Sequence, residues 1–299
     1  MAYYTGSVNS YAELQTALVN ACTANGWALN SGILSKGRAF IKPSVSATNG
    51  IGLVIEGGTG QSGASLINPS PQAARLGQPY ANNYWPSVTW PAQYHIHLGI
   101  SPDEVYVVMN TNVTDFYWLA FGLSSVPMAG TGLWMAASSP RLQASTYGAA
   151  MNETGGTQSQ SYGCPVIFWA SSPYDVNYNS IAVQSAANGS WPMHTSVGIT
   201  SLRPLIERYE LVWNKAAVLL PAREYVTAPE NKRQLLIDAA HARLVRLGSL
   251  EPGQILQLGP DRWRVYPFLR KNTASPNSAA SNAMSHSGTF GWALRYDGP

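Results

Sequence analysis

Short apolar runs separated by turn residues constrain the fold of this chain more than any other feature. Three such runs, Tyr94–Leu98, Glu104–Met109 and Phe116–Phe121, are rich in β-branched and aromatic side chains, which favour strands. The segments between them, Ser101–Asp103 and Asn110–Asn112, consist of residues that favour tight turns. The centre of the chain is therefore predicted to be a β-meander.

One short helix is predicted before the strands. Ser10 is a typical N-cap residue, and Glu13 follows three positions later, as in a capping box. Leu14 and Leu18 then follow at helical spacing, and Gly26 is a typical residue at which a helix ends. The sequence predicts a β-rich α+β fold, in which this short N-terminal helix is followed by antiparallel β-meanders with long irregular loops.

Two long loops and one domain boundary are expected. Residues 57–92 are rich in glycine and proline, and residues 138–162 are rich in serine, glycine, glutamine and threonine. A soft boundary near residue 200 separates an N-terminal α+β domain, residues 1–200, from a β-rich C-terminal domain, residues 201–299. Whether these are two domains or one intimately joined unit stays open. Residues 229–237 are expected to form a short piece of helix.

The end of the chain is predicted to be a packed strand. The segment Thr289–Tyr296 is aromatic and spaced by glycine, whereas a frayed tail would be polar and repetitive. Deleting residues 286–299 is expected to abolish soluble folding or assembly, because several large side chains would leave the core together. Alternate positions share one face of a strand, so the candidate structural residues of this strand are Phe290, Trp292, Leu294 and Tyr296.

Charged residues are scarce. They make up 11% of the chain, against about 25% in a typical globular protein. A surface of neutral polar groups suits a protein that partners cover, because such groups cost less to desolvate than ions. The 16 tyrosines and 10 tryptophans fit two explanations, since aromatic residues are enriched at interfaces and also favour strands.

The few charges are unevenly spread. Residues 1–200 contain 5 Lys and Arg against 7 Asp and Glu, a balance of −2, whereas residues 201–299 contain 13 against 8, a balance of +5. The two balances sum to the net charge of +3. A local excess of this size is too small to indicate nucleic-acid binding, and it equally suits an acidic patch on a protein partner.

Two groups of residues are candidates for a protein interface. Aromatic side chains in the first loop would be costly to leave in water, and they are expected to dock onto a partner. A small basic and aromatic cluster in the C-terminal part places two arginines on one strand face and Trp263 on the other. The candidate interface residues are Tyr80, Tyr84, Trp85, Trp90, Arg262, Arg264, Arg270 and Lys271.

No motif predicts a catalytic residue, a metal site or a cofactor. The segment Gly58–Gly63 spells the glycine pattern of a dinucleotide-binding turn, but Pro69 and Pro71 exclude the helix that must follow it. His95 and His97 share one face of a strand, as metal ligands could. A structural pair is favoured, because the sequence joins no third ligand to them.

The cysteines and the N-terminal segment indicate in which cellular compartment the chain is made. Cys22 and Cys164 belong to no metal-binding motif, so one long-range disulfide and two buried free thiols both stay open. The N-terminus lacks the basic and apolar regions of a secretory signal, and no apolar stretch is long enough to span a membrane. The chain is expected to be made in the cytoplasm, to be soluble and to have no membrane partner.

Several segments resemble a family of tailed-bacteriophage virion proteins. The resemblance covers most of the chain and is patchy between residues 57–92 and 138–200. It implies a structural component of the virion in the neck, tail or baseplate, whose partners are copies of itself and other virion proteins, and it carries over no catalytic residue. The segments concerned are Tyr4–Gly6, Tyr11–Leu14, Cys22–Trp27, Pro102–Tyr106, Phe116–Gly122, Gly259–Pro267, Arg270–Asn272 and His286–Asp297.

Two other functions stay open. A carbohydrate- or receptor-binding module at the tail tip would stack exposed tryptophans on sugars, and the tryptophans in loop-like stretches are Trp85, Trp90, Trp134 and Trp191. A polysaccharide hydrolase would need two carboxylates across a cleft. Its candidate acids are Asp103, Glu104, Asp115, Glu153 and Asp175.

Overall fold

The structure is a computed structural model, and it describes a subset of the chain. The described residues are 1–46, 51–71, 73–78, 88–113, 115–137, 182–185, 188–189, 191, 217–227, 233–268, 271 and 290–299. Within these ranges the chain forms one α-helix near the N-terminus and four antiparallel sheets. The predicted β-rich fold with a short N-terminal helix is confirmed.

The largest sheet, called the middle sheet here, has six strands in the order β1-β9-β10-β11-β12-β13. Its three neighbouring strands β9, β10 and β11 are the β-meander that the sequence predicts. Val107 at its centre pairs with Ile96 on one side and Leu119 on the other. The strands are β1 (Ala2–Val8), β9 (Ala92–Gly99), β10 (Glu104–Thr111), β11 (Asp115–Leu123), β12 (Leu133–Ala137) and β13 (Ala182–Val183).

A second sheet follows the helix α1 (Tyr11–Ala24) in sequence and has the order β2-β3-β4-β5-β8. A small hairpin, β6 (Gly60–Ser62) with β7 (Ser65–Ile67), extends from it. We call this second sheet the helix-side sheet. Its strands are β2 (Ala28–Asn30), β3 (Ile33–Lys36), β4 (Ala39–Ser46), β5 (Ile51–Gly58) and β8 (Ala74–Gln78).

The third large sheet comes from the last part of the chain and is called the C-terminal sheet. Its order is β14-β15-β18-β17-β16, so that the final strand lies at its centre between β15 and β17. Its strands are β14 (Leu220–Thr227), β15 (Arg233–Arg246), β16 (Ile255–Leu258), β17 (Asp261–Pro267) and β18 (Phe290–Arg295).

The local chemistry of α1 follows its sequence. The Ser10 side chain accepts a hydrogen bond from the Glu13 backbone N–H at 3.2 Å, and the Glu13 carboxylate accepts one from the Asn9 backbone N–H at 2.8 Å. These contacts satisfy two backbone donors at the start of the helix. After the helix, Gly26 adopts a φ of 81°, a backbone conformation that favours glycine.

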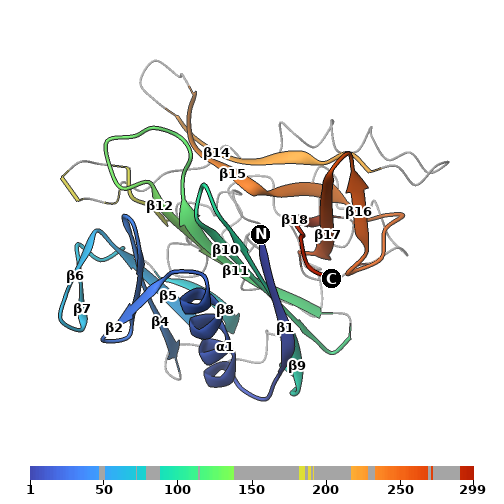
Figure 1. Cartoon of the computed structure of the whole chain (residues 1–299), viewed down its shortest axis with the longest axis horizontal. Coiled ribbons are helices and arrows are strands. Elements are labelled where there is room, and N and C mark those ends of the chain that lie inside the picture. The colour runs from blue at the N-terminus through green and yellow to red at the C-terminus, as the bar shows by residue number, and fades with distance from the viewer. Residues whose placement is uncertain are drawn as a thin grey trace, which may run out of the picture.

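The middle sheet is buried on both faces (Figure 1). One face packs against α1 and the helix-side sheet, and Val107 and Leu119 belong to that cluster. The other face packs against the C-terminal sheet, and Val108 and Trp118 belong to that second cluster. Because neighbouring residues of a strand point to opposite faces, β10 needs apolar residues at consecutive positions.

The C-terminal strand lies deep in this arrangement. Trp292, Leu294 and Tyr296 are all buried. The ring of Trp292 makes edge contacts with Trp118 of the middle sheet at 5.5 Å and with Phe268 at 5.0 Å between ring centroids. The N-terminal and C-terminal parts of the chain therefore share one core cluster, although the expected boundary near residue 200 lies outside the described residues.

Two sequence-based expectations are wrong. In the expected loop of residues 57–92, residues 60–62, 65–67 and 74–78 form strands, because a tight turn at Gly63 (φ 59°) closes a hairpin and β8 pairs with β5. Residues 79–87 and the second loop, 138–162, lie outside the described residues. In the segment expected to be helical, residues 233–237 belong to β15, which pairs with β14.

Among the described residues, no helix is long and apolar enough to cross a membrane. Cys22 is a buried free thiol of α1, and burial raises its pKa to about 12. Its expected alternative partner, Cys164, lies outside the described residues.

Candidate functional site

A buried polar seam lies where the first strand of the chain meets the last two. It joins β1 and β9 of the middle sheet to β17 and the end of β18 in the C-terminal sheet. We call it the terminal seam. Its residues are Tyr3, His95, His97, Arg262, Arg264, Tyr266 and Tyr296.

Hydrogen bonds fix the protonation of His97. Its Nδ1 lies 3.1 Å from the backbone oxygen of Arg295, and its Nε2 lies 3.0 Å from the hydroxyl of Tyr266. A carbonyl oxygen can only accept, so Nδ1 carries the proton and Nε2 accepts from Tyr266. Both ring nitrogens of His97 are therefore used within the chain.

His95 is held in the same way from the other side. The hydroxyl of Tyr3 lies 2.7 Å from His95 Nδ1, and Arg264 donates to that hydroxyl at 2.7 Å. The Tyr3 hydroxyl accepts a hydrogen bond from the guanidinium and can donate its own O–H to the imidazole. Burial lowers the pKa of His97 to about 3 and that of His95 to about 4, and the positive charge of Arg264 contributes to both shifts. Both rings are thus neutral at neutral pH.

These contacts make the histidine pair structural. Although neutral imidazoles can bind metals, no group of three His, Cys, Asp or Glu side chains able to hold a metal occurs in the part of the chain that the structure describes. His95 and His97 do share one face of β9, as the sequence predicts, and that face packs on Tyr266.

Two of the candidate interface residues lie inside the seam. The guanidinium carbon of Arg264 lies 5.3 Å from the ring centre of Tyr3, 5.9 Å from that of Tyr266 and 5.5 Å from that of Tyr296. Arg262 lies 5.3 Å from the ring of Tyr296 and donates to the Gly298 carbonyl at 2.7 Å. Both arginines therefore hold the end of the chain against β17 through hydrogen bonds and cation–π contacts.

The remaining candidate interface residues are scattered. Lys271 makes an ion pair with Glu251 at 2.9 Å. Trp90 is partly buried, and its ring makes an edge contact with Tyr11 of α1 at 5.2 Å. The other four, Tyr80, Tyr84, Trp85 and Arg270, lie outside the described residues. The structure therefore brings Arg262 and Arg264 together, and it shows no common surface for Trp90 and Lys271, the other two candidates within the described residues.

Ion pairs extend the seam to its exposed rim. The ammonium group of Met1 lies 2.6 Å from the carboxylate of Asp297, and Arg295 lies 2.7 Å from that of Asp261. The hydrogen bond with the ammonium group lowers the pKa of the Asp297 carboxyl. The first and last strands are thus linked by both buried and exposed contacts.

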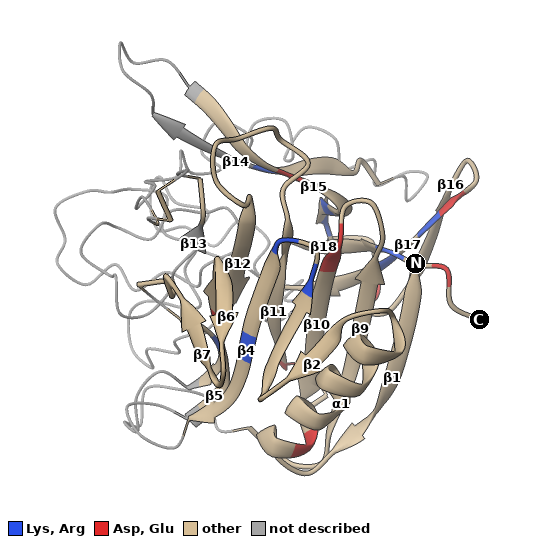
Figure 2. Cartoon of the chain, turned by 60° about the vertical axis from the view of Figure 1, so that its left-hand side comes forward, with Lys and Arg blue, Asp and Glu red and all other residues tan. Residues whose placement is uncertain are grey.

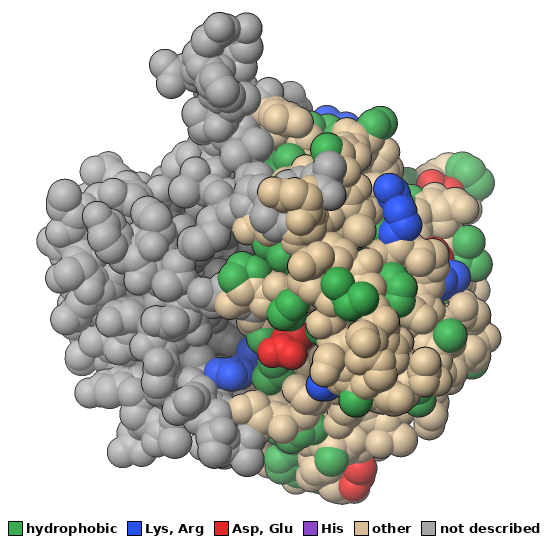
Figure 3. Space-filling view, turned by 90° about the vertical axis from the view of Figure 1, so that its left-hand side faces the viewer, with side chains coloured by type: hydrophobic (Ala, Val, Ile, Leu, Met, Phe, Trp, Pro, Cys, Tyr) green, Lys and Arg blue, Asp and Glu red, His purple; other side chains and the backbone are tan. Residues whose placement is uncertain are grey.

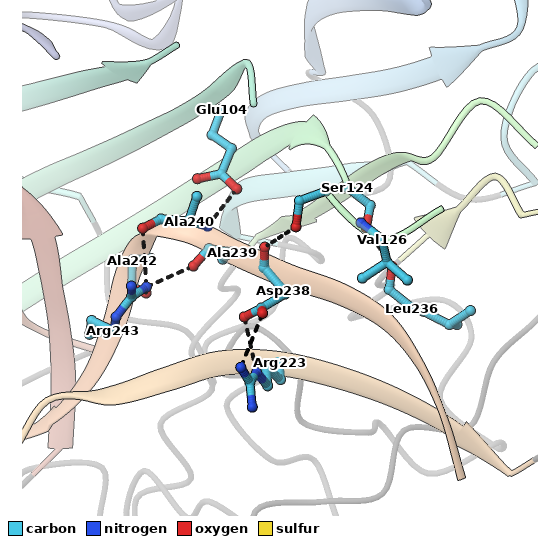
Figure 4. A network of polar contacts seen from close by, with 11 residues as sticks. Glu104, Ser124, Val126, Arg223, Leu236, Asp238, Ala239, Ala240, Ala242 and Arg243 are labelled. Carbon is cyan, nitrogen blue, oxygen red and sulfur yellow. Dashed lines mark hydrogen bonds and ion pairs between the residues drawn. The ribbon is translucent and has the colours of Figure 1, made fainter. Parts of the chain in front are cut away.

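A second polar cluster ties the middle sheet to β15 (Figure 4). The Glu104 carboxylate is 0% exposed and accepts hydrogen bonds from the backbone N–H groups of Ala240 and His241, each at 2.9 Å. It also accepts from the Tyr106 hydroxyl at 2.9 Å and lies 2.9 Å from His241 Nδ1. We call this cluster the Glu104 clamp.

Two local features make room for the contacts of the Glu104 clamp: a register shift in the pairing of β15 and a glycine at position 99. The pairing of β14 with β15 shifts between Pro221 and Ala222, and this shift leaves the N–H groups of Ala240 and His241 free to bind Glu104. Gly99 of β9 is the strand partner of Glu104 of β10. A Cβ atom added to Gly99 would lie 2.2 Å from His241 Nδ1. Only glycine leaves room for the imidazole.

Two of the described candidate acids, Glu104 and Asp115, do not form the pair that a glycoside hydrolase needs. Glu104 pairs with Gly122, whereas Asp115 pairs with Thr111, seven positions along β10. That separation is roughly 23 Å, against about 5–9.5 Å between the two carboxyl groups of such enzymes. Asp103 makes an ion pair with Lys36 at 2.8 Å. Glu153 and Asp175 lie outside the described residues.

The described tryptophans belong to the core. Of the candidate sugar-stacking residues, Trp134 is fully buried, and Trp191 is buried with its ring N–H donating to the Asn68 carbonyl at 2.8 Å. Buried rings offer no face to a sugar. In these ranges the aromatic composition therefore reflects strand packing. The buried tryptophans are Trp27, Trp118, Trp134, Trp191, Trp263 and Trp292.

The chain matches no family model, and the comparison with curated proteins finds no match. Sequence reasoning missed Tyr3, Tyr266 and His241 as members of these clusters. Their partners are distant in the chain, since Tyr3 binds Arg264 and His241 binds Glu104, so no local pattern could have indicated them. The pairing of strands creates both sites.

Proposed function

We propose that this chain is a structural component of a tailed-phage virion, in the neck, tail or baseplate, which acts by assembling with copies of itself and with other virion proteins. The observation that carries the proposal is a surface poor in charge. On the face shown in Figure 3, the described side chains are mostly neutral polar or apolar. In Figure 2 the charged residues within the described ranges are isolated segments, and they form no continuous strip of either sign.

A surface of this kind favours burial against other proteins. Each ion that an interface covers must lose its hydration, and this cost often exceeds what a new ion pair returns. Neutral polar groups cost less to cover than ions do, and the burial of exposed aliphatic side chains lowers the free energy of the assembly. The exposed large aliphatic residues of the described surface are Leu29, Val45, Ile67, Ile100, Val113, Val218, Ile255 and Leu258.

The resemblance of the opening and closing segments to virion proteins supports the same function. Those segments build the terminal seam, since Tyr3, Arg264 and Tyr296 lie in or beside them. In this proposal the seam is scaffolding that keeps the two ends of the chain packed. The charged residues there bind within the chain.

Nothing specific among the described residues favours the two alternatives. A sugar-binding module would need exposed aromatic rings, and the described tryptophans are buried or partly buried. A hydrolase would need two carboxylates facing one cleft, and Glu104 and Asp115 are far apart on the β10–β11 hairpin.

The composition of purified phage particles tests the proposal. Particles from the phage that encodes the chain should contain it at a fixed copy number, measured by quantitative mass spectrometry. Antibody labelling in electron micrographs should place it at the neck, tail or baseplate. Complete, infectious particles that lack the chain would contradict the proposal, whatever the abundance of the chain in the lysate.

A further inference from the structure

The edge strand β16 carries two exposed aliphatic side chains. Ile255 and Leu258 are each 43% exposed, and the strand Ile255–Leu258 contains no charged residue. On one side β16 pairs with β17, and on the other side no strand pairs with it among the described residues. In both Figure 1 and Figure 2 the strand lies towards the outer edge of the described part of the chain.

An edge of this kind is unusual for a protein that stays alone. Edge strands are generally protected from further pairing by lysine, proline, a bulge or an inward-pointing charge. β16 has none of these within its bounds, and its short length of four residues is the one protection of this kind that it has. The nearby arginines Arg262 and Arg264 bind within the terminal seam, where they do not shield this edge.

The backbone of β16 has groups ready for a further strand. The backbone N–H of Val265 in β17 donates a hydrogen bond to the backbone carbonyl of Gln254 at 3.0 Å. The backbone polar groups of residue 254 therefore face β17. In an antiparallel ladder, alternate residues bond to the same neighbour. Leu256 and Leu258 therefore also direct their backbone groups to β17. The N–H and C=O groups of Ile255 and Gln257 point outward.

We propose that β16 pairs in antiparallel fashion with β16 of a second copy of this chain, in register about Gln257. The inference rests on the proposed assembly function. In this register each Gln257 backbone donates to and accepts from its counterpart, and Leu256 lies opposite Leu258 of the second copy. An uncharged strand can pair with itself without like-charge repulsion.

The side-chain packing of β16 also supports pairing with a second copy of this chain. Leu256 packs against the apolar cluster on the outer face of the C-terminal sheet, which includes Trp263 and Val265. Leu258 is two positions further along and shares that face. Pairing about Gln257 would place the leucines of both copies in one row, which would continue this cluster from one copy into the next.

The contact is small, so the association of isolated chains is expected to be weak. Four residues per copy give two central hydrogen bonds and a short leucine row, which is less than a stable dimer interface normally buries. In a particle, where other contacts hold the copies near each other, a weak contact is strengthened by its high effective concentration.

Sedimentation of the full chain at concentrations up to about 1 mM tests the contact. The wild type should show concentration-dependent dimers. Leu258→Lys should weaken the association at least about tenfold, because it places two ammonium groups beside the leucine row. Ile67→Lys is the matched control, since Ile67 is 44% exposed on the distant hairpin strand β7. It should leave the association unchanged, and thermal unfolding should show both variants to be folded.

A cysteine at the centre of the register tests the pairing itself. Gln257→Cys should form a disulfide dimer under mild oxidation, because residues directly opposite in a hydrogen-bonded pair have Cα atoms about 5.5 Å apart. Ile67→Cys and the wild type, which retains Cys22 and Cys164, should not.

Three results would overturn the inference: a wild type that stays monomeric throughout, a Leu258→Lys variant that associates as the wild type does, or a Gln257→Cys variant that fails to cross-link. None of these decides whether the chain is part of the virion, because particle composition is measured separately. Conversely, particles without the chain would remove the proposed function even if dimers formed in solution.

Discussion

At the scale of single residues, the Glu104 carboxylate links two sheets. Glu104→Ala would leave the N–H groups of Ala240 and His241 and the hydroxyl of Tyr106 without their acceptor in a buried place. We expect a loss of about 3–5 kcal/mol in the free energy of unfolding, measured by urea denaturation. Asp103→Ala is the neighbouring control and should cost about 1 kcal/mol or less, because the Asp103–Lys36 pair is partly exposed. Equal losses would contradict the clamp.

Also at this scale, the two seam histidines make stability depend on pH. An unfolded histidine has a pKa of about 6.5, whereas burial lowers the pKa of His97 to about 3 and that of His95 to about 4. Below about pH 6.5 the unfolded chain binds protons that the folded chain does not. Stability is therefore complete above that pH and falls by about 1.4 kcal/mol per histidine for each pH unit towards the folded pKa.

The variant His97→Gln tests this dependence. Gln can still hydrogen-bond to Tyr266 or to the Arg295 carbonyl, but it does not titrate. We expect the slope of unfolding free energy against pH, between about pH 4.5 and 6, to decrease by about 1.4 kcal/mol per pH unit. A slope identical to that of the wild type would show that His97 is not a buried neutral group in the folded chain.

At the scale of elements, deletion of β18 is expected to lower the stability of the fold by a large amount. Deleting residues 290–299 removes Trp292 and Leu294 from the core and leaves β15 and β17 without the strand between them. The cost exceeds a typical stability of about 5–15 kcal/mol, so no soluble folded chain is expected by circular dichroism and gel filtration. Deleting only residues 297–299 keeps β18 and should preserve the fold. A folded protein without β18 would contradict this prediction.

The elements also show what a sequence can predict. Helix α1 and strand β9 were predictable, because the cap at Ser10 and the turn residues around the strand are local signals. Strand β15 was mistaken for helix in part. Its residues Leu236 and Ile237 are adjacent and both buried, so the alternation that identifies a half-exposed strand is missing. The hairpin β6–β7 was hidden by glycine-rich sequence that also suits a loop.

The clamp and the seam lay beyond prediction for a different reason. Each depends on which strands become neighbours across two sheets, and the hydrogen bond between Tyr3 and Arg264 spans most of the chain. Periodicity placed His95 and His97 on one face but could not name Tyr266 as their neighbour. Long-range pairing is decided by packing of the whole core, for which a local sequence pattern carries little information.

At the scale of the whole molecule, the middle sheet contributes one face to each of two hydrophobic cores. Val107 and Val108 are consecutive residues of β10, both buried, and they belong to the clusters on opposite faces. Unfolding either outer sheet would expose one face of the middle sheet to water. The described parts of residues 1–200 and 201–299 are therefore expected to unfold in one cooperative transition, as small single domains do.

Two matched substitutions test this coupling. Val107→Ala and Val108→Ala remove the same atoms from opposite faces of one strand, and each should lower the free energy of unfolding by roughly 2 kcal/mol. If the sheets are one cooperative unit, both variants shift the same single transition, seen alike by tryptophan fluorescence and far-ultraviolet circular dichroism. Two transitions, with Val108→Ala affecting one and Val107→Ala the other, would mean that the C-terminal sheet unfolds by itself. The shared cluster argues against this, because Trp292 of β18 packs on Trp118 of the middle sheet, and neither ring can stay buried if the other sheet leaves.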